Sequence, residues 1–135
     1  MRRAGTLFAD LTGGSYSALG QAFDEEDVPR LIGTRPTGEQ VHIAGMSDGA
    51  RDQLYLALRL AYLEDYASRS EPIPFIGDDI FMTFDDARTK NGILALAAIG
   101  EKVQPILFTH HQYVVDLALE ALGEGVNILK LGTGA

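Results

Sequence analysis

The sequence predicts one α/β domain, in which a small antiparallel β meander precedes a mostly parallel sheet flanked by helices. Two observations predict this. The first third contains short apolar stretches separated by turn-forming residues, whereas helical patterns alternate with short apolar strands from residue 46 onward. A chain of 135 residues is also long enough to bury a core. We therefore expect a single domain over 1–135, with the meander in 1–45 and the rest in 46–135.

The meander is expected to contain three strands. A short helix at 4–10 precedes them, and two turns separate them, the acidic DEED and the proline- and glycine-containing RPTGEQ. Consecutive strands joined by such short turns pair as antiparallel neighbours. The expected strands span residues 16–23, 30–34 and 41–44.

A long helical stretch follows, in GMSDGARDQLYLALRLAYLEDYASRS. Ser47 is a good N-cap residue, and leucines at helical spacing predict a largely buried helix. Gly49 weakens a helix, so its place in the first turn indicates that something approaches the backbone closely there. Backbone N–H groups at a helix start, beside a hydroxyl, also suit an anion such as phosphate.

A short apolar strand at 73–76 runs into the paired carboxylates Asp78 and Asp79. Ligands bind at the carboxyl ends of parallel strands in α/β sheets. Adjacent carboxylates on a strand end point to opposite faces, so one can hold a divalent metal while the other polarises a water molecule. An acidic, capped helix start, with Asp85 and Asp86 favoured by the helix dipole, is an equally good interpretation of this stretch alone.

A second buried strand, at 103–109, ends directly before His110 and His111. Side-chain alternation places these two histidines on opposite sides if the strand continues, and we expect His111 to be structural. Helix, strand and helix then alternate through the second half. The remaining expected elements are helices at 87–100 and 112–122 and a last strand at 126–131.

The composition excludes several classes of protein. The net charge of −8 argues against a general polyanion-binding surface. The absence of cysteine excludes disulfides and thiolate metal sites. No apolar run reaches membrane-spanning length, and no signal-peptide segment follows the two N-terminal arginines. We expect a cytoplasmic protein without a membrane partner.

Four stretches, in this order, resemble the motifs of ABC-type ATPase heads of the SMC-like class. MSDGARDQLYLALRLA resembles the signature motif and its helix, IPFIGDD the Walker B strand, the FD of 84–85 the D-loop, and FTHH the switch-histidine loop. The chain is thus similar to the C-terminal lobe of such a head, most of all in YhaN-type bacterial AAA (P-loop) ATPases. The resemblance covers roughly residues 11–118 and implies a P-loop NTPase fold with ATP and Mg²⁺ as cofactors.

The resemblance also implies a role for each matching residue. Asp78 would engage Mg²⁺ through its water shell, Asp79 would act as general base or position the water, and His110 would contact the γ-phosphate or the attacking water. Asp85 would lie at an interface between two heads. The γ-phosphate of nucleotide held by that second head would meet Ser47, Asp48, Gly49 and Ala50, with Arg51 and Gln53 as helpers.

Several residues depart from the family pattern. Asp48 replaces a glycine and brings negative charge to a phosphate site, unless it pairs with Arg51. Gly77 stands where an aliphatic side chain is usual, and Asp79 stands where most relatives carry glutamate.

The largest departure is that no GxxxxGK[ST] occurs in the sequence, and no heptad segment is present. The chain therefore lacks the loop that cradles the phosphates and is expected to be a C-terminal fragment or half-gene. It should be inactive alone and need a Walker A lobe, from the same or another chain, and a second head. The full protein would act on DNA, in repair or chromosome maintenance.

Two other functions are compatible with the sequence. The chain can be a non-catalytic assembly or dimerisation module that keeps the motifs as an interface. It can also be a metal-dependent nuclease or phosphatase, with Asp78, Asp79, Asp85 and Asp86 around two metal ions.

Overall fold

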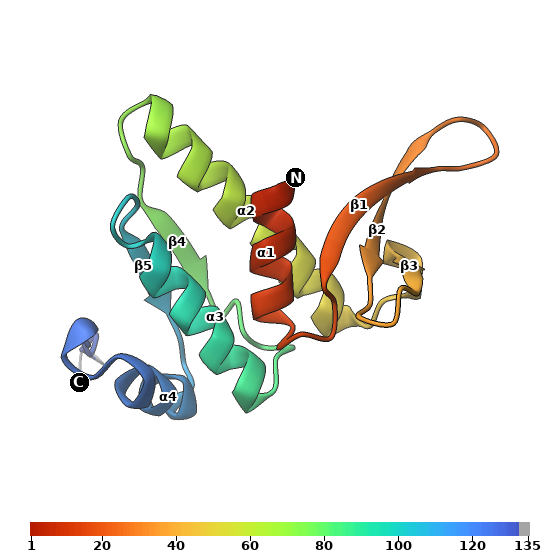
Figure 1. Ribbon diagram of the computed structural model, residues 1–135. Helices are drawn as coiled ribbons and strands as arrows, with labels where there is room; N and C mark the ends of the chain where they lie inside the picture. Colours follow the sequence, from red (N-terminus) through yellow and green to blue (C-terminus); the bar gives the residue numbers. More distant parts are fainter. Residues whose placement is uncertain (133–135) are drawn as a thin grey trace.

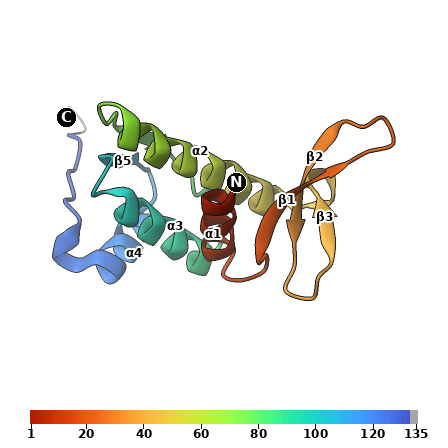
Figure 2. The same ribbon diagram turned by 45° about the horizontal axis from the view of Figure 1, so that its top comes forward.

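The computed structural model describes residues 1–132. Figure 1 shows α1, α2 and α3 packed together beside the strands β4 and β5, with a β meander extending to one side. The meander and α4 lie at opposite ends of the molecule (Figure 2). The elements are α1 (Arg2–Leu11), β1 (Ala18–Phe23), β2 (Pro29–Thr34), β3 (Gln40–His42), η1 (Ile43–Gly45), α2 (Asp48–Arg69), β4 (Phe75–Asp78), α3 (Asp86–Ile99), β5 (Pro105–Phe108), α4 (Gln112–Leu122) and η2 (Gly123–Gly125).

The predicted antiparallel meander is confirmed. Strands β1, β2 and β3 pair in chain order, with Ala18 opposite Thr34 and Ile32 opposite His42. The third strand is shorter than expected, because the chain turns into the 3₁₀ helix η1 after His42. That turn places Met46 in the core, where it is 5% exposed.

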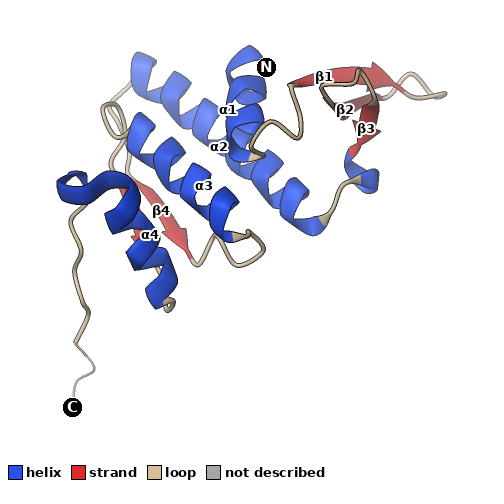
Figure 3. Ribbon diagram, turned by 60° about the horizontal axis from the view of Figure 1, so that its bottom comes forward, coloured by secondary structure: helices blue, strands red, loops and turns tan. Residues whose placement is uncertain are grey.

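The parallel part consists of two strands within residues 1–132. β4 and β5 pair in parallel, with Phe75 opposite Pro105 and Asp78 opposite Phe108. Figure 3 shows α3 and α4 packed side by side next to this pair. The predicted helices over 87–100 and 112–122 are confirmed as α3 and α4.

The prediction of a last strand over 126–131 is wrong. The chain after η2 pairs with no strand in the described part of the chain, and its Leu129 and Leu131 are 78% and 76% exposed. Its sequence favours an extended strand, but a strand also needs a neighbouring edge that supplies hydrogen bonds. Within residues 1–132, this segment pairs with the edge of neither sheet.

One face of the β4–β5 pair is covered and the other is open. Phe75 and Gly77 point inward, whereas Ile76, Ile106 and Phe108 on the opposite face are 38% to 59% exposed. Parallel sheets are normally covered on both faces. This pair therefore has the packing of a sheet that lacks a second layer.

Packing within the chain explains why a glycine stands at residue 77. A Cβ at this position would lie 3.0 Å from the Cδ1 atom of Ile80, whose side chain folds back over the strand. Ile80 thus occupies the space that an aliphatic side chain at residue 77 would fill.

The core lies between α1, α2 and α3. Leu54, Ala57 and Leu60 of α2 are fully buried, as the spacing of the leucines predicted. They belong to one apolar cluster that includes Phe8 and Leu11 of α1. No helix within residues 1–132 has the length and apolar character needed to cross a membrane.

A bidentate ion pair links α1 to α2. The Nε and Nη2 atoms of Arg3 each donate to a carboxylate oxygen of Glu64 at 2.8 Å, and the Glu64 side chain is only 13% exposed. The hydrogen bond from Arg3 lowers the pKa of Glu64 below its ordinary value of 4.5, although burial opposes this shift. The same bond raises the pKa of Arg3.

We expect Glu64→Gln to lower the free energy of unfolding by about 1 kcal/mol at neutral pH. Because the pKa of Glu64 is lower in the folded state, this stabilisation is complete above pH 4.5 and is lost as the pH falls through the lowered pKa. Urea unfolding of wild type and variant should therefore differ at neutral pH and converge in acid. A difference that stays constant across this range would contradict the assignment.

Candidate functional site

Asp79 lies directly after β4 in a left-handed backbone conformation, with φ of +48°. This conformation is costly for a residue with a side chain, and such strain gathers at functional sites. Its backbone N–H donates to the Phe108 carbonyl at 2.9 Å, which prolongs the β4–β5 ladder by one bond. The turn directs the carboxylate inward, where it is 17% exposed.

The structure brings Asp79 and His110 together, as the strand ends predicted. The Oδ1 atom of Asp79 accepts a hydrogen bond from the His110 backbone N–H at 3.3 Å. The Nε2 atom of His110 lies 3.8 Å from Oδ2 of Asp79, and the His110 side chain is 86% exposed. One carboxylate therefore fixes the start of the histidine loop while the imidazole remains open to a ligand.

Asp78 is exposed, on the same open face of the sheet as Ile76, whereas the Asp79 side chain turns inward. The expected division of the two carboxylates between different environments is thus observed. Over residues 1–132, His, Asp and Glu side chains form no cluster of three or more that could hold a metal ion. Among these residues, Asp78 is therefore not part of a cluster that could enclose a metal ion.

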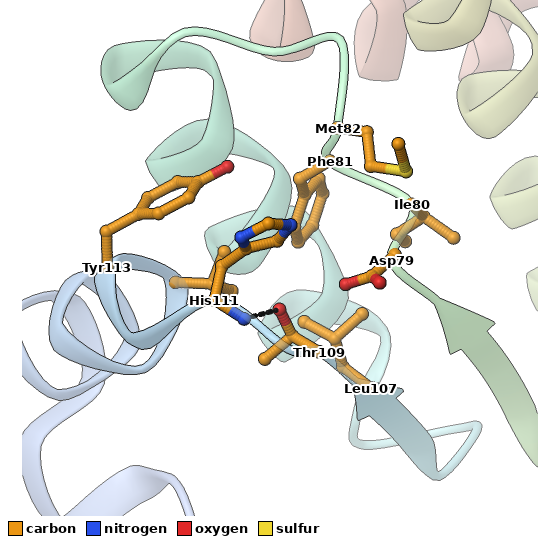
Figure 4. A pocket seen from close by; sticks show the side chains of 9 residues that line it. Asp79, Ile80, Phe81, Met82, Leu107, Thr109, His111 and Tyr113 are labelled. Atoms are coloured by element: carbon orange, nitrogen blue, oxygen red, sulfur yellow. Dashed lines mark hydrogen bonds between the residues drawn. The ribbon is translucent and has the colours of Figure 1, made fainter.

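A cavity of about 10 Å³ lies beside Asp79, with room for about one water molecule. Figure 4 shows the polar side chains of Asp79, Thr109 and His111 at its wall. The Thr109 hydroxyl accepts from the His111 backbone N–H at 3.1 Å, and the His111 ring lies 5.5 Å from that of Tyr113. The rest of the wall is apolar and comprises Ile80, Phe81, Met82, Leu107 and Val114.

His111 does not point away from the site, contrary to our expectation. The argument from alternation required β5 to continue through the histidines, but the strand ends at Phe108. His111 is instead the N-cap residue of α4 and lines the cavity with Asp79. The two adjacent histidines in FTHH were the sequence feature that could have indicated a position for His111 beside Asp79.

The start of α2 is capped as predicted. The Ser47 hydroxyl accepts from the Ala50 backbone N–H at 3.2 Å. Asp48 forms an ion pair with Arg51, so its charge is partly compensated beside the exposed helix start. No hydrogen bond or ion pair in the described range joins residues 47–51 directly to Asp79 or His110.

Gly49 meets the protein's own backbone. A Cβ at this position would lie 2.9 Å from the Thr83 carbonyl oxygen. The close approach that the glycine indicated therefore involves the loop after β4. A second contact joins the same two segments, because Thr83 Oγ1 donates to Asp52 Oδ2 at 2.7 Å.

Gln53 is fully buried, and neither polar atom of its side-chain amide has a hydrogen-bond partner within residues 1–132. A side chain in this position does not reach a nucleotide at the protein surface. Burial therefore removes Gln53 from the candidate nucleotide contacts. Helical spacing predicted a buried face, and Gln53 lies on it next to Leu54.

Asp85 caps α3, since its Oδ1 atom accepts from the Arg88 backbone N–H at 2.8 Å. Asp86 follows in the first turn, and the Asp85 side chain stays 65% exposed. The structure therefore divides the acidic stretch between two elements. Asp78 and Asp79 lie at a strand end, and Asp85 and Asp86 begin a helix.

Comparison with known proteins places this geometry in context. No family model matches the chain. YhaN of Bacillus subtilis (strain 168), an uncharacterized protein, is 34% identical over 117 residues, which are 86% of this chain and 12% of YhaN. The SMC head domain of Pyrococcus furiosus, with an extended coiled coil and bound to the C-terminal domain of ScpA, superposes with a TM-score of 0.64. The chain has the fold of an SMC head lobe.

The likeness to this SMC head covers 86% of the chain and 29% of the matched one, at 20% sequence identity. A structure from work on ATP-driven dimerization and DNA-stimulated activation of SMC ATPases matches with a TM-score of 0.60 and 17% identity, over 86% of this chain and 72% of that one. The resemblance to an SMC-like C-terminal lobe, related to YhaN, is thereby confirmed. The chain spans only a small part of YhaN and of the P. furiosus head.

Proposed function

We propose that the chain is the signature and Walker B lobe of an SMC-like ATPase head, which hydrolyses ATP once a Walker A lobe completes it. The observation that carries this proposal is the contact between Asp79 and His110 at the ends of two neighbouring parallel strands. A carboxylate and an imidazole in such contact can position and deprotonate one water molecule, which is the main protein contribution to phosphoryl transfer besides charge stabilisation.

Each of the two residues has a separate task in this proposal. Asp79 holds the attacking water, because its carboxylate is shielded from bulk solvent and anchored by the His110 backbone N–H. His110 contacts the γ-phosphate, because its ring is exposed above that carboxylate. Asp79 therefore acts on the nucleophile and His110 on the group that is transferred.

The exposed carboxylate of Asp78 fits the binding of Mg²⁺-ATP. Mg²⁺ keeps several waters and usually takes one or two carboxylates together with phosphate oxygens. Asp78 offers a single exposed carboxylate at the strand end, which matches this donor set. When bound, the ion neutralises charge on the phosphates.

The open sheet face supports the need for a second lobe. Ile76, Ile106 and Phe108 are exposed on a parallel strand pair, and such pairs are stable when both faces are covered. The sequence also contains no phosphate-binding GxxxxGK[ST] loop. We propose that a Walker A lobe, from the same or a separate chain, covers this face and supplies the loop.

The signature stretch is proposed to act on a second head. The backbone N–H groups at the start of α2, beside Ser47, suit the γ-phosphate of nucleotide bound to that head. The ATP-driven dimerization named for a matched SMC structure supports this arrangement. A DNA-directed role of the whole protein, a single-domain organisation over 1–135 and a cytoplasmic location remain part of the proposal.

The same open face favours one alternative, a non-catalytic module that joins a partner without hydrolysing ATP. The two-metal nuclease has no such support. Among the residues that the structure describes, no three acidic or histidine side chains gather as ligands.

The test is Mg-ATP binding and hydrolysis by this chain, alone and mixed with a candidate Walker A lobe. We expect no ATP hydrolysis by the chain alone and measurable hydrolysis when the two lobes are mixed. Asp86→Asn alters an exposed carboxylate outside the proposed site and should not change this result. Turnover by the isolated chain would contradict the need for a second lobe. Tight binding of the two lobes without turnover would favour the assembly module.

A further inference from the structure

We propose that the hydrogen bond between Asp52 and Thr83 couples the start of α2 to Asp79, so that nucleotide contacting α2 sets the position of the Asp79 carboxylate. Asp52 and Thr83 are positioning residues in this proposal, because neither acts on nucleotide itself. The inference rests on the proposed function and deepens it, since it names how the two halves of the site communicate.

Two contacts join these segments at one point. The Thr83 hydroxyl donates to the Asp52 carboxylate at 2.7 Å, across 31 residues of sequence. One turn earlier on α2, Gly49 lets the Thr83 carbonyl approach so closely that a Cβ would lie 2.9 Å from its oxygen. Both the side chain and the backbone of Thr83 thus contact the first turns of α2.

The loop between Thr83 and Asp79 is short and tightly held. Met82 N–H donates to the Asp79 carbonyl at 3.4 Å, and Phe84 N–H donates to the Phe81 carbonyl at 3.0 Å. Phe81 and Phe84 are 2% and 7% exposed, and their ring centroids are 5.3 Å apart. Thr83 is therefore joined to the Asp79 backbone through a short segment that is held by its own hydrogen bonds and by two buried rings.

Packing against α3 removes further freedom. A Cβ at Gly92 would lie 2.4 Å from the Phe81 ring, so the ring rests directly on the α3 backbone. On the other side, the Asp79 N–H is bonded to β5 through the Phe108 carbonyl. The loop is clamped by α3 and β5, and Thr83 is its contact with α2.

Because the Asp52–Thr83 hydrogen bond is exposed, we expect it to matter more for turnover in the assembled protein than for the isolated fold. Both side chains are exposed, so water competes for the bond and the bond contributes little to folding. A second head placed over the α2 start would exclude that water and strengthen the bond. Loss of the bond should therefore affect turnover in the assembled state more than the stability of the fold.

The test uses the complete protein that contains this chain, with matched substitutions. Thr83→Val keeps the shape but removes the donor, whereas Thr83→Ser keeps the donor. We expect Thr83→Val to lower ATP turnover about tenfold with unchanged ATP affinity and unfolding temperature, and Thr83→Ser to retain wild-type turnover. If wild type turns over ATP, equal turnover of the two variants would overturn the proposal.

A double-mutant cycle separates coupling from two independent effects. Asp52→Ala should reduce turnover as Thr83→Val does, and the double variant should be no slower than either single one. Losses that multiply would show that the two side chains act separately and would overturn the proposal.

Amide hydrogen exchange distinguishes this proposal from the proposed function. Thr83→Val should speed exchange of the Met82 and Phe84 amides in the ATP-bound protein, whereas Thr83→Ser should not. If wild type shows no ATP turnover with a Walker A lobe, the proposed function fails. The coupling is still supported in that case if the Met82 and Phe84 amides exchange more slowly in wild type and Thr83→Ser than in Thr83→Val. Exchange that is identical in the two variants overturns the coupling whatever the turnover.

Discussion

Replacing Asp79 by asparagine in the complete head is expected to lower ATP hydrolysis by about 10²- to 10⁴-fold while ATP binding stays intact. The amide has the shape of the carboxylate, and its oxygen can still accept from the His110 N–H. Asparagine also tolerates the left-handed conformation at this position, which most residues do not. The substitution therefore removes the base and leaves the fold.

The measurement is steady-state turnover together with ATP affinity at equilibrium. Asp86→Asn serves as the control, because Asp86 is an exposed carboxylate in the first turn of α3 with no role in the proposed site. Unchanged turnover in Asp79→Asn would remove Asp79 from its proposed role. Loss of ATP affinity would instead indicate that Asp79 holds the nucleotide.

Ser47→Arg is expected to abolish ATP-driven pairing of heads. The substitution places a long side chain at the α2 start, where the proposal requires close approach of a γ-phosphate from the second head. It also removes the cap on the Ala50 N–H, which costs about 1 kcal/mol. The two effects must be separated before the loss of pairing can be assigned.

Ser47→Ala is the matched control, because it loses the same cap without adding bulk. Size-exclusion chromatography with ATP should show pairing in wild type, reduced pairing at most in Ser47→Ala, and monomeric heads in Ser47→Arg. If the arginine variant still pairs with ATP, the α2 start does not act across the dimer.

Local sequence chemistry was sufficient to predict most of the elements and part of the site. The Ser47 cap, the leucine spacing of α2, the turns of the meander and the two polar strand ends are all set by neighbours within a few residues. The contact between Asp79 and His110 was also predictable, since adjacent parallel strands end at one edge. These features need no knowledge of distant contacts beyond strand pairing.

Features that depend on a distant partner were decided only by the tertiary structure. Residues 126–131 have a strand-forming sequence, but within residues 1–132 this segment pairs with no strand and forms none. Gly49 and Asp52 meet Thr83 about thirty residues away, and Gln53 is buried by packing of the helices. His111 lines the Asp79 cavity because β5 ends at Phe108 and does not continue through the histidines, as the argument from alternation assumed. Sequence determined most of the helices, strands and turns, because these preferences are local, but it did not determine the state of residues 126–131. The environment of each side chain depended on which segments packed together.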